Sequence, residues 1–116
     1  MVGVLPSELS SISSIKEIHF YGNNINGTVP EQIFDLALEI FDIENNKLSG
    51  QIFPEIIFSS IKNTLSQFLV SHNTFTGTIP SRIGELTALT RFWVGSNKLS
   101  GSIPKQLANL TRLGKT

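Results

Sequence analysis

Four short stretches of the chain, residues 15–23, 38–46, 65–73 and 89–97, share one pattern of apolar and polar positions. In each of them the first, fourth and sixth residues are apolar and the ninth is an asparagine. The alternation around the fourth and sixth positions is what a β-strand with one buried face requires. The pattern therefore predicts four short strands, each ending at its asparagine.

A second pattern follows each of these stretches. In the third unit Gly77 comes first, then Ile79 and Pro80, and then Ile83 and Leu86. A glycine permits a tight turn that a Cβ would hinder, and a proline fixes φ where the chain leaves a short extended piece. The apolar spacing after the proline is helical, so we expect a short helical segment on the side away from the strand.

The two patterns together repeat along the whole chain. Asn73 and Asn97, in matching places of the last two units, are 24 positions apart, and such a period is typical of a stacked solenoid. All five prolines occupy the same place in the repeat: Pro6, Pro30, Pro54, Pro80 and Pro104. We predict one repeat domain over residues 3–113, made of a half repeat (3–14), four repeats (15–37, 38–64, 65–88 and 89–112) and the start of a further repeat at 113.

The asparagine at the end of each strand is expected to have a structural role and not a catalytic one. Its amide both donates and accepts hydrogen bonds, so it can satisfy backbone groups of its own turn and of the neighbouring coil. Successive coils would then form a ladder of amides: Asn23, Asn46, Asn73 and Asn97.

The repeat LxxLxLxxNxLxGxIPxxLxxLxxL resembles the plant-type leucine-rich repeat, and the resemblance covers residues 3–113. The GxIP element distinguishes this subclass from others. The resemblance implies an α/β solenoid, a right-handed coil with a parallel concave β-sheet, short second extended segments and short helical or 3-10 outer segments. The family includes receptor-kinase ectodomains, receptor-like proteins without a kinase, and secreted inhibitors of cell-wall-degrading enzymes.

The second repeat departs from this pattern. Phe53 is inserted before Pro54, and eleven residues then lead to Leu65, against eight or nine elsewhere. We expect a bulge on the outer side within residues 58–64, filled or covered by Phe53 and Phe58.

The ends depart from the pattern as well, because they lack the dedicated caps that are usual in the family. We expect either a fragment of a longer solenoid or a partner stacked on the ends. Apolar residues at both ends would then expose the edges of the core: Leu9, Ile12, Ile15, Leu107, Leu110 and Leu113.

Charge and cysteine content exclude several classes of protein. Nine basic and nine acidic side chains cancel, which gives no electrostatic case for nucleic acid or an anionic membrane. Without cysteine there is no disulfide, zinc–thiolate site or cysteine nucleophile. No apolar run reaches the roughly 20 residues of a membrane helix, so we expect no membrane insertion by this segment. The chain shows no signal peptide, and only the family resemblance implies an extracellular or cell-surface location.

The strand residues between the buried positions are expected to line the concave face, where solenoid proteins bind. Trp93, the only tryptophan, would point outward beside Leu69, and exposed aromatic residues are common interface anchors. Asp42 and Glu44 form an acidic spot that could receive a basic group. The candidate ligand-binding residues are Trp93, Leu69, Arg91, Asp42, Glu44, His19 and Tyr21. Two alternatives stay open: the tryptophan lies flat over its neighbours, and the acidic side chains are ordinary solvated charges.

The candidates for acid–base or metal chemistry do not form a recognisable site. His19, Asp42, Glu44 and His72 would lie on an open strand surface, and the two histidines lack the spacing of metal ligands. The motifs GxSxG, GxGxxG and GxxxxGK are absent. We therefore predict that the protein is not an enzyme and needs no cofactor or metal.

Two triplets fit N-glycosylation, and they begin at Asn26 and Asn109. Both fall away from the concave strands, in a turn after a strand and near the end of an outer segment. The alternative is that the repeat itself generates such triplets, since asparagine and threonine are frequent in turns.

These features predict non-catalytic recognition of a protein or peptide through the concave strand face, as part of a receptor-like protein. The alternatives are a secreted inhibitor of a cell-wall-degrading enzyme and a structural scaffold that assembles through uncapped ends. Ice binding ranks last, because Thr74, Thr76 and Thr78 favour it but the other turns do not repeat them.

Overall fold

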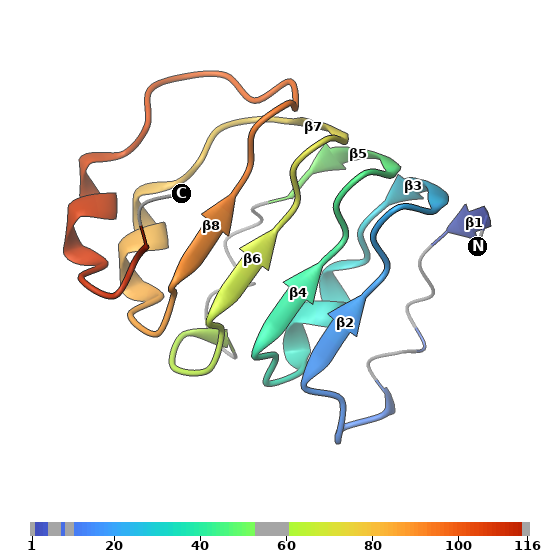
Figure 1. Cartoon of the computed structure of the whole chain (residues 1–116), viewed down its shortest axis with the longest axis horizontal. Coiled ribbons are helices and arrows are strands. Elements are labelled where there is room, and N and C mark those ends of the chain that lie inside the picture. Colours follow the sequence, from blue (N-terminus) through green and yellow to red (C-terminus); the bar gives the residue numbers. More distant parts are fainter. Residues whose placement is uncertain (1, 5–7, 9–10, 53–60, 115–116) are drawn as a thin grey trace.

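The chain winds into a right-handed solenoid, in which successive coils add strands to two parallel sheets (Figure 1). The computed structural model describes residues 2–4, 8, 11–52 and 61–114. The solenoid measures 36 × 30 × 23 Å along its principal axes. The predicted α/β solenoid with a parallel concave sheet is confirmed.

The first sheet forms the concave face and contains the four strands predicted from the alternating pattern, but each strand ends four residues before its asparagine and not at it. Its order is β2 (Glu17–His19), β4 (Ile40–Asp42), β6 (Gln67–Leu69) and β8 (Arg91–Trp93). The register aligns the central residues of the strands, and the pleat turns these toward the core while their neighbours face the other side.

The second extended segments form a complete parallel sheet of their own. Its order is β1 (Val2–Val4), β3 (Asn24–Thr28), β5 (Lys47–Gln51) and β7 (Thr74–Thr76). One apolar residue of each strand from β3 to β7 points inward and is fully buried: Ile25, Leu48 and Phe75. Each coil is therefore held to the next by backbone hydrogen bonds on two sides.

Short 3-10 helices complete the coils at η2 (Glu31–Asp35), η4 (Ser81–Glu85) and η5 (Lys105–Asn109). A proline precedes each of them in extended conformation, and its fixed φ and missing N–H suit the start of a helix. Within the described part of the chain, no helix has the length and apolar character needed to cross a membrane.

A column of phenylalanines runs through the core along the solenoid axis. The rings of Phe41 and Phe68 stack with centroids 5.7 Å apart, and Phe92 continues the stack 5.9 Å from Phe68. Phe34 from η2 meets Phe41 edge-on at 5.1 Å. These offset and edge-to-face arrangements are the ones that aromatic rings prefer, so the column ties three adjacent strands to one another.

The apolar residues at the ends of the solenoid were expected to be exposed, and only some of them are. Leu110 is only 4 % exposed, because η5 packs against η4, and Leu107 and Leu113 are partly buried. Ile12 is half exposed, as expected, and Ile103 is 73 % exposed. Leu9, the inserted Phe53 and residues 58–60 of the expected bulge, among them Phe58, lie outside the described residues.

Candidate functional site

The asparagine amides bridge neighbouring coils through the backbone. Asn73 Nδ2 donates to the carbonyls of Val70 and Ser71 in its own turn, at 3.2 and 3.4 Å, and to that of Ile43 in the preceding coil, at 3.0 Å. Its Oδ1 accepts the N–H of Leu48 at 3.0 Å. Asn46 and Asn97 make the corresponding bonds. For Asn23 the amide donates to Tyr21 O at 3.1 Å.

A residue with left-handed backbone conformation directly precedes each ladder asparagine and turns the chain away from the concave sheet. In three coils this residue is not glycine: φ is 58° at Asn45, 61° at His72 and 53° at Ser96. In the first coil Gly22 takes the same place with φ 71°. The turn brings the amide inward, and the sequence pattern alone had not revealed it.

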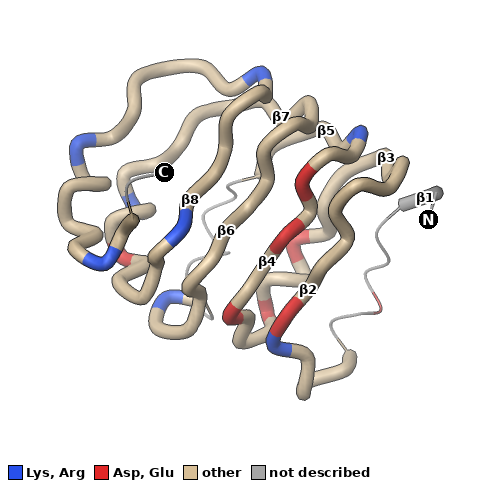
Figure 2. The backbone as a smooth tube through the Cα atoms, in the orientation of Figure 1, with Lys and Arg blue, Asp and Glu red and all other residues tan. Residues whose placement is uncertain are grey.

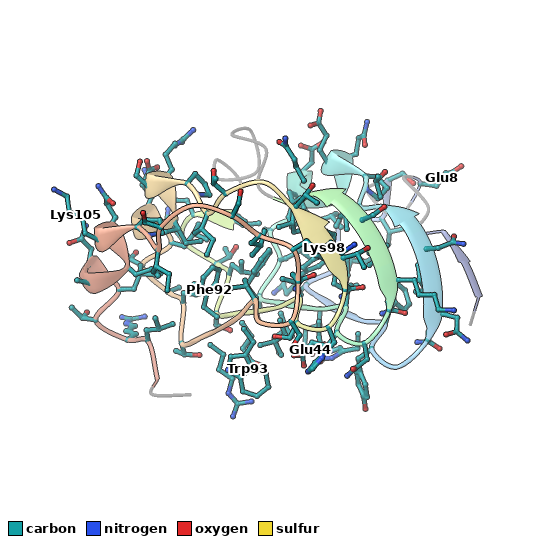
Figure 3. All side chains as sticks on the ribbon, turned by 90° about the horizontal axis from the view of Figure 1, so that it is seen from above. Glu8, Glu44, Phe92, Trp93, Lys98 and Lys105 are labelled. Carbon is teal, nitrogen blue, oxygen red and sulfur yellow. The ribbon has the colours of Figure 1, made fainter. Side chains whose placement is uncertain are left out.

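Two rows of side chains cross the concave strands. The strand register aligns His19, Asp42, Leu69 and Trp93 in the first row. Backbone hydrogen bonds between adjacent coils align the second row two residues further along: Tyr21, Glu44, Ser71 and Gly95. Figure 3 shows Glu44 and Trp93 projecting on the same side of the molecule.

The acidic part of this surface lies on β4 and just beyond it. The N–H of Glu44 donates to Asp42 Oδ1 at 3.2 Å. Partial burial raises the pKa of the Glu44 carboxyl, and the nearby Asp42 charge raises it further, while a hydrogen bond with the Ser71 side chain and the proximity of His72 oppose the rise. Next to it on β2, His19 Nε2 lies 2.9 Å from Glu17 Oε1, and both side chains are about half exposed.

The aromatic part of the surface lies on β8. Trp93 is partly buried, and the guanidinium of Arg91 lies 5.6 Å from the centroid of its ring, a cation–π distance. Leu69 corrects the expectation of an exposed neighbour, since it is only 5 % exposed. Its register partner in the neighbouring strand is Trp93, the largest side chain of this row. Leu69 therefore presents little surface to a ligand.

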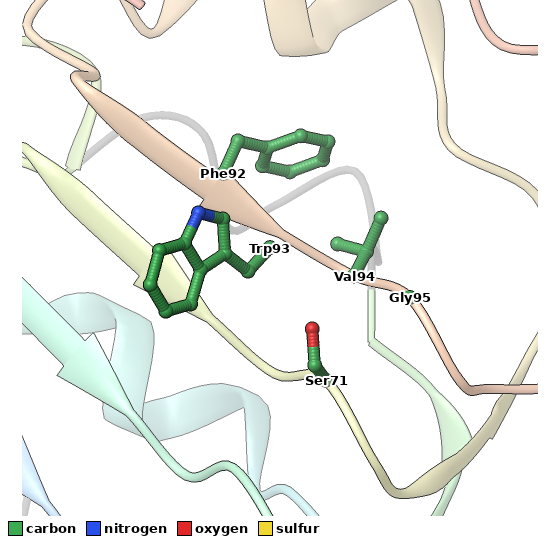
Figure 4. A pocket seen from close by; sticks show the side chains of 5 residues that line it. All are labelled: Ser71, Phe92, Trp93, Val94 and Gly95. Carbon is green, nitrogen blue, oxygen red and sulfur yellow. The ribbon is translucent and has the colours of Figure 1, made fainter. Parts of the chain in front are cut away.

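A shallow hollow of about 390 Å³ opens beside the tryptophan, between β6 and β8 (Figure 4). Five residues line it: Ser71, Phe92, Trp93, Val94 and Gly95. The sequence reasoning had singled out only Trp93 among them. The sequence did contain a signal for the hollow, because the second row of side chains ends in two small residues, a serine and a glycine.

The two glycosylation triplets lie on other faces. Asn26 is exposed in β3 of the second sheet, and Asn109 is exposed as the last residue of η5. Neither belongs to the strands of the concave sheet. Among residues 11–52 and 61–114 and the other described positions, no group of three metal-ligating side chains comes together.

Comparison with known proteins gives matches along most of the chain. The Leucine Rich Repeat family matches residues 37–59 and 88–110. Receptor-like protein 48 of Arabidopsis thaliana is 32 % identical over 85 residues, which is 72 % of this chain and 10 % of that protein.

Two crystal structures from Arabidopsis are similar at comparable identity. The receptor kinase HAESA, in complex with the peptide hormone IDA and the co-receptor SERK1, is 34 % identical with a TM-score of 0.87, and the match covers 94 % of this chain and 18 % of that one. A chain of the BIR3–SERK2 complex is 36 % identical with a TM-score of 0.84, covering 92 % and 56 %. The chain thus spans between about a tenth and just over half of the length of these relatives.

Proposed function

The chain belongs to the leucine-rich repeat family, and from this premise we propose that its concave face recognises a protein or peptide ligand without catalysis, as part of a receptor-like protein. The observation that carries the proposal is the pair of rows across β2, β4, β6 and β8. They contain Trp93, Asp42 and Glu44, and the guanidinium of Arg91 lies against the Trp93 ring. These four are not residues that the repeat needs for its own coil. An aromatic anchor beside charges of both signs is typical of an interface.

The relatives support the same conclusion. HAESA, to which 94 % of this chain is similar, is a receptor kinase bound to a peptide hormone in its crystal structure. Receptor-like protein 48 has a related sequence. By the same similarity we infer an extracellular or cell-surface location for this chain. We also propose that His19 and Tyr21 contact the ligand at the β2 end of the concave face.

The test is selection of peptides on the purified chain. Random peptides of about twelve residues reach roughly 40 Å when extended, which suffices to cross a solenoid 36 Å long. Calorimetric titration of the enriched peptides then measures affinity for the chain and for its Trp93→Ala variant. We expect this substitution to weaken binding by about 2 kcal/mol or more, because a central aromatic anchor is lost.

A matched control is Gln32→Ala, an exposed residue of η2 on the outer side of the coil. It should leave peptide affinity unchanged. If the tryptophan substitution also leaves every peptide unaffected, or if the two substitutions weaken binding equally, recognition through the concave face is wrong.

A further inference from the structure

The hollow beside Trp93 arises from a decrease in side-chain size along the second row. That row begins with Tyr21 and Glu44 and ends with Ser71 and Gly95. A Cβ built on Gly95 would meet no atom within 4 Å, so the space above this glycine is open. The coil itself does not require a glycine there, because Gly95 is not among the residues with positive φ.

The apolar part of the lining is held in place. It comes from Trp93 on the concave side and from Phe92 and Val94, the neighbours of Trp93 that pack against the core. Phe92 stacks on Phe68 of the core, and Arg91 packs on the tryptophan ring at 5.6 Å. A ligand group with an aliphatic stem can therefore bury that stem against a surface that is already ordered.

Two carboxylates, those of Glu44 and Asp42, lie beyond the Ser71 side of the hollow. Ser71 lines the hollow, and Glu44 is its neighbour in the second row, where the N–H of Asn45 donates to Ser71 O at 3.1 Å. Asp42 lies next to Glu44 and influences its titration. Figure 2 shows that acidic positions follow β2 and β4, whereas the basic position on the concave strands lies on β8. The Glu44 carboxylate thus belongs to the row position next to Ser71, which lines the hollow, and Asp42 lies beside Glu44.

We propose that the hollow binds a lysine or arginine side chain of the peptide ligand, with its aliphatic stem against Trp93 and its charged end at Glu44 and Asp42. The inference rests on the proposed function and names the chemistry that the ligand must carry. Lysine and arginine bury an apolar stem while the charged head stays hydrated or paired, which is the combination that the hollow offers. Approach to the indole face adds a cation–π attraction.

Other occupants fit less well. An aliphatic side chain would fill the apolar wall but would shield the carboxylates from water without pairing them, which is unfavourable. An acidic side chain would be repelled by Glu44 and Asp42. The guanidinium of Arg91 is exposed to solvent and contacts the tryptophan, and it is not one of the residues that line the hollow.

The experiment takes the peptides selected above and replaces each lysine or arginine, one at a time, by norleucine, which keeps an aliphatic stem and removes the charge. Binding is followed by the fluorescence of Trp93, the only tryptophan of the chain. One replacement should weaken binding to the natural chain about tenfold or more, the size of effect that charged hydrogen bonds have. In the double variant Asp42→Asn, Glu44→Gln the same replacement should change affinity less than about threefold.

A second variant tests the space instead of the charge. Gly95→Leu should fill the hollow and weaken the cationic peptide about tenfold, while the circular dichroism spectrum stays unchanged because its Cβ meets no atom within 4 Å. Two results would overturn this inference and leave the proposed function standing. Peptides that depend on Trp93 could keep their affinity after every norleucine replacement, or they could lose the same affinity for the natural chain and for the double variant. If no selected peptide depends on Trp93, both proposals fail.

Discussion

In each coil one side chain, the asparagine, forms hydrogen bonds with several backbone groups at once. In the third coil the Asn73 side chain is 6 % exposed and makes three donated bonds and one accepted bond. A side chain without an amide of this reach would leave buried polar groups without partners, and such groups are costly. The hydrogen bonds of the backbone therefore explain why this position is asparagine in all four repeats, without any role in ligand binding.

Asn73→Ala should lower the free energy of unfolding by about 2 kcal/mol or more, because the buried N–H of Leu48 loses its acceptor. The carbonyls of Ile43 and Val70 also lose a donor in the same substitution. Urea denaturation followed by circular dichroism measures the change. The control is Asn63→Ala at an exposed position, for which we expect a change within about 0.5 kcal/mol. Similar losses in the two variants would contradict the amide's role.

The turn that follows β7 of the second sheet depends on the backbone conformation of one glycine. Gly77 has φ 91°, and a Cβ there would lie 3.3 Å from Gln51 Cγ in the neighbouring coil. Gly95, which follows the concave strand β8, has open space around it and no positive φ. The backbone conformation therefore requires a glycine at position 77 and not at position 95.

Gly77→Ala should destabilise the chain by about 1–2 kcal/mol, the cost of holding a residue with a Cβ in the left-handed region. Gly95→Ala should stay within about 0.5 kcal/mol of the natural chain. Differential scanning calorimetry under identical conditions compares the two variants. If both lower the melting temperature by the same amount, the conformational argument for Gly77 does not hold.

The strands and their register could be predicted because their pattern has a short, strict period. Phe41, Phe68 and Phe92 occupy the fourth position of each stretch, and the structure stacks them in one column. The candidate surface was harder to predict, because a linear pattern assigns a residue to a face and says nothing of what leans over it. Leu69 was placed on the correct face, yet it is only 5 % exposed beside its register partner Trp93. The hollow likewise depends on the sizes of residues from different coils, which lie more than twenty positions apart in sequence.

The faces of the solenoid separate two kinds of chemistry. The concave sheet carries the aromatic and charged side chains that vary between coils, whereas the two triplets that fit N-glycosylation lie on the second sheet and on η5. An oligosaccharide is large and hydrated, so it can be tolerated only where no ligand has to approach. The positions of Asn26 and Asn109 leave the concave face clear.

We therefore expect both asparagines to be glycosylated when the chain is directed into the secretory pathway of a eukaryotic host by an added signal peptide. Intact-mass measurement before and after enzymatic removal of N-glycans should show two sites, and Asn26→Gln and Asn109→Gln should each remove one. Affinity for a peptide selected on the unmodified chain should change less than about twofold, since neither position belongs to the four concave strands. A secreted chain without glycans would show that the repeat merely generates the triplets, and a large loss of affinity upon glycosylation would place the ligand on another face.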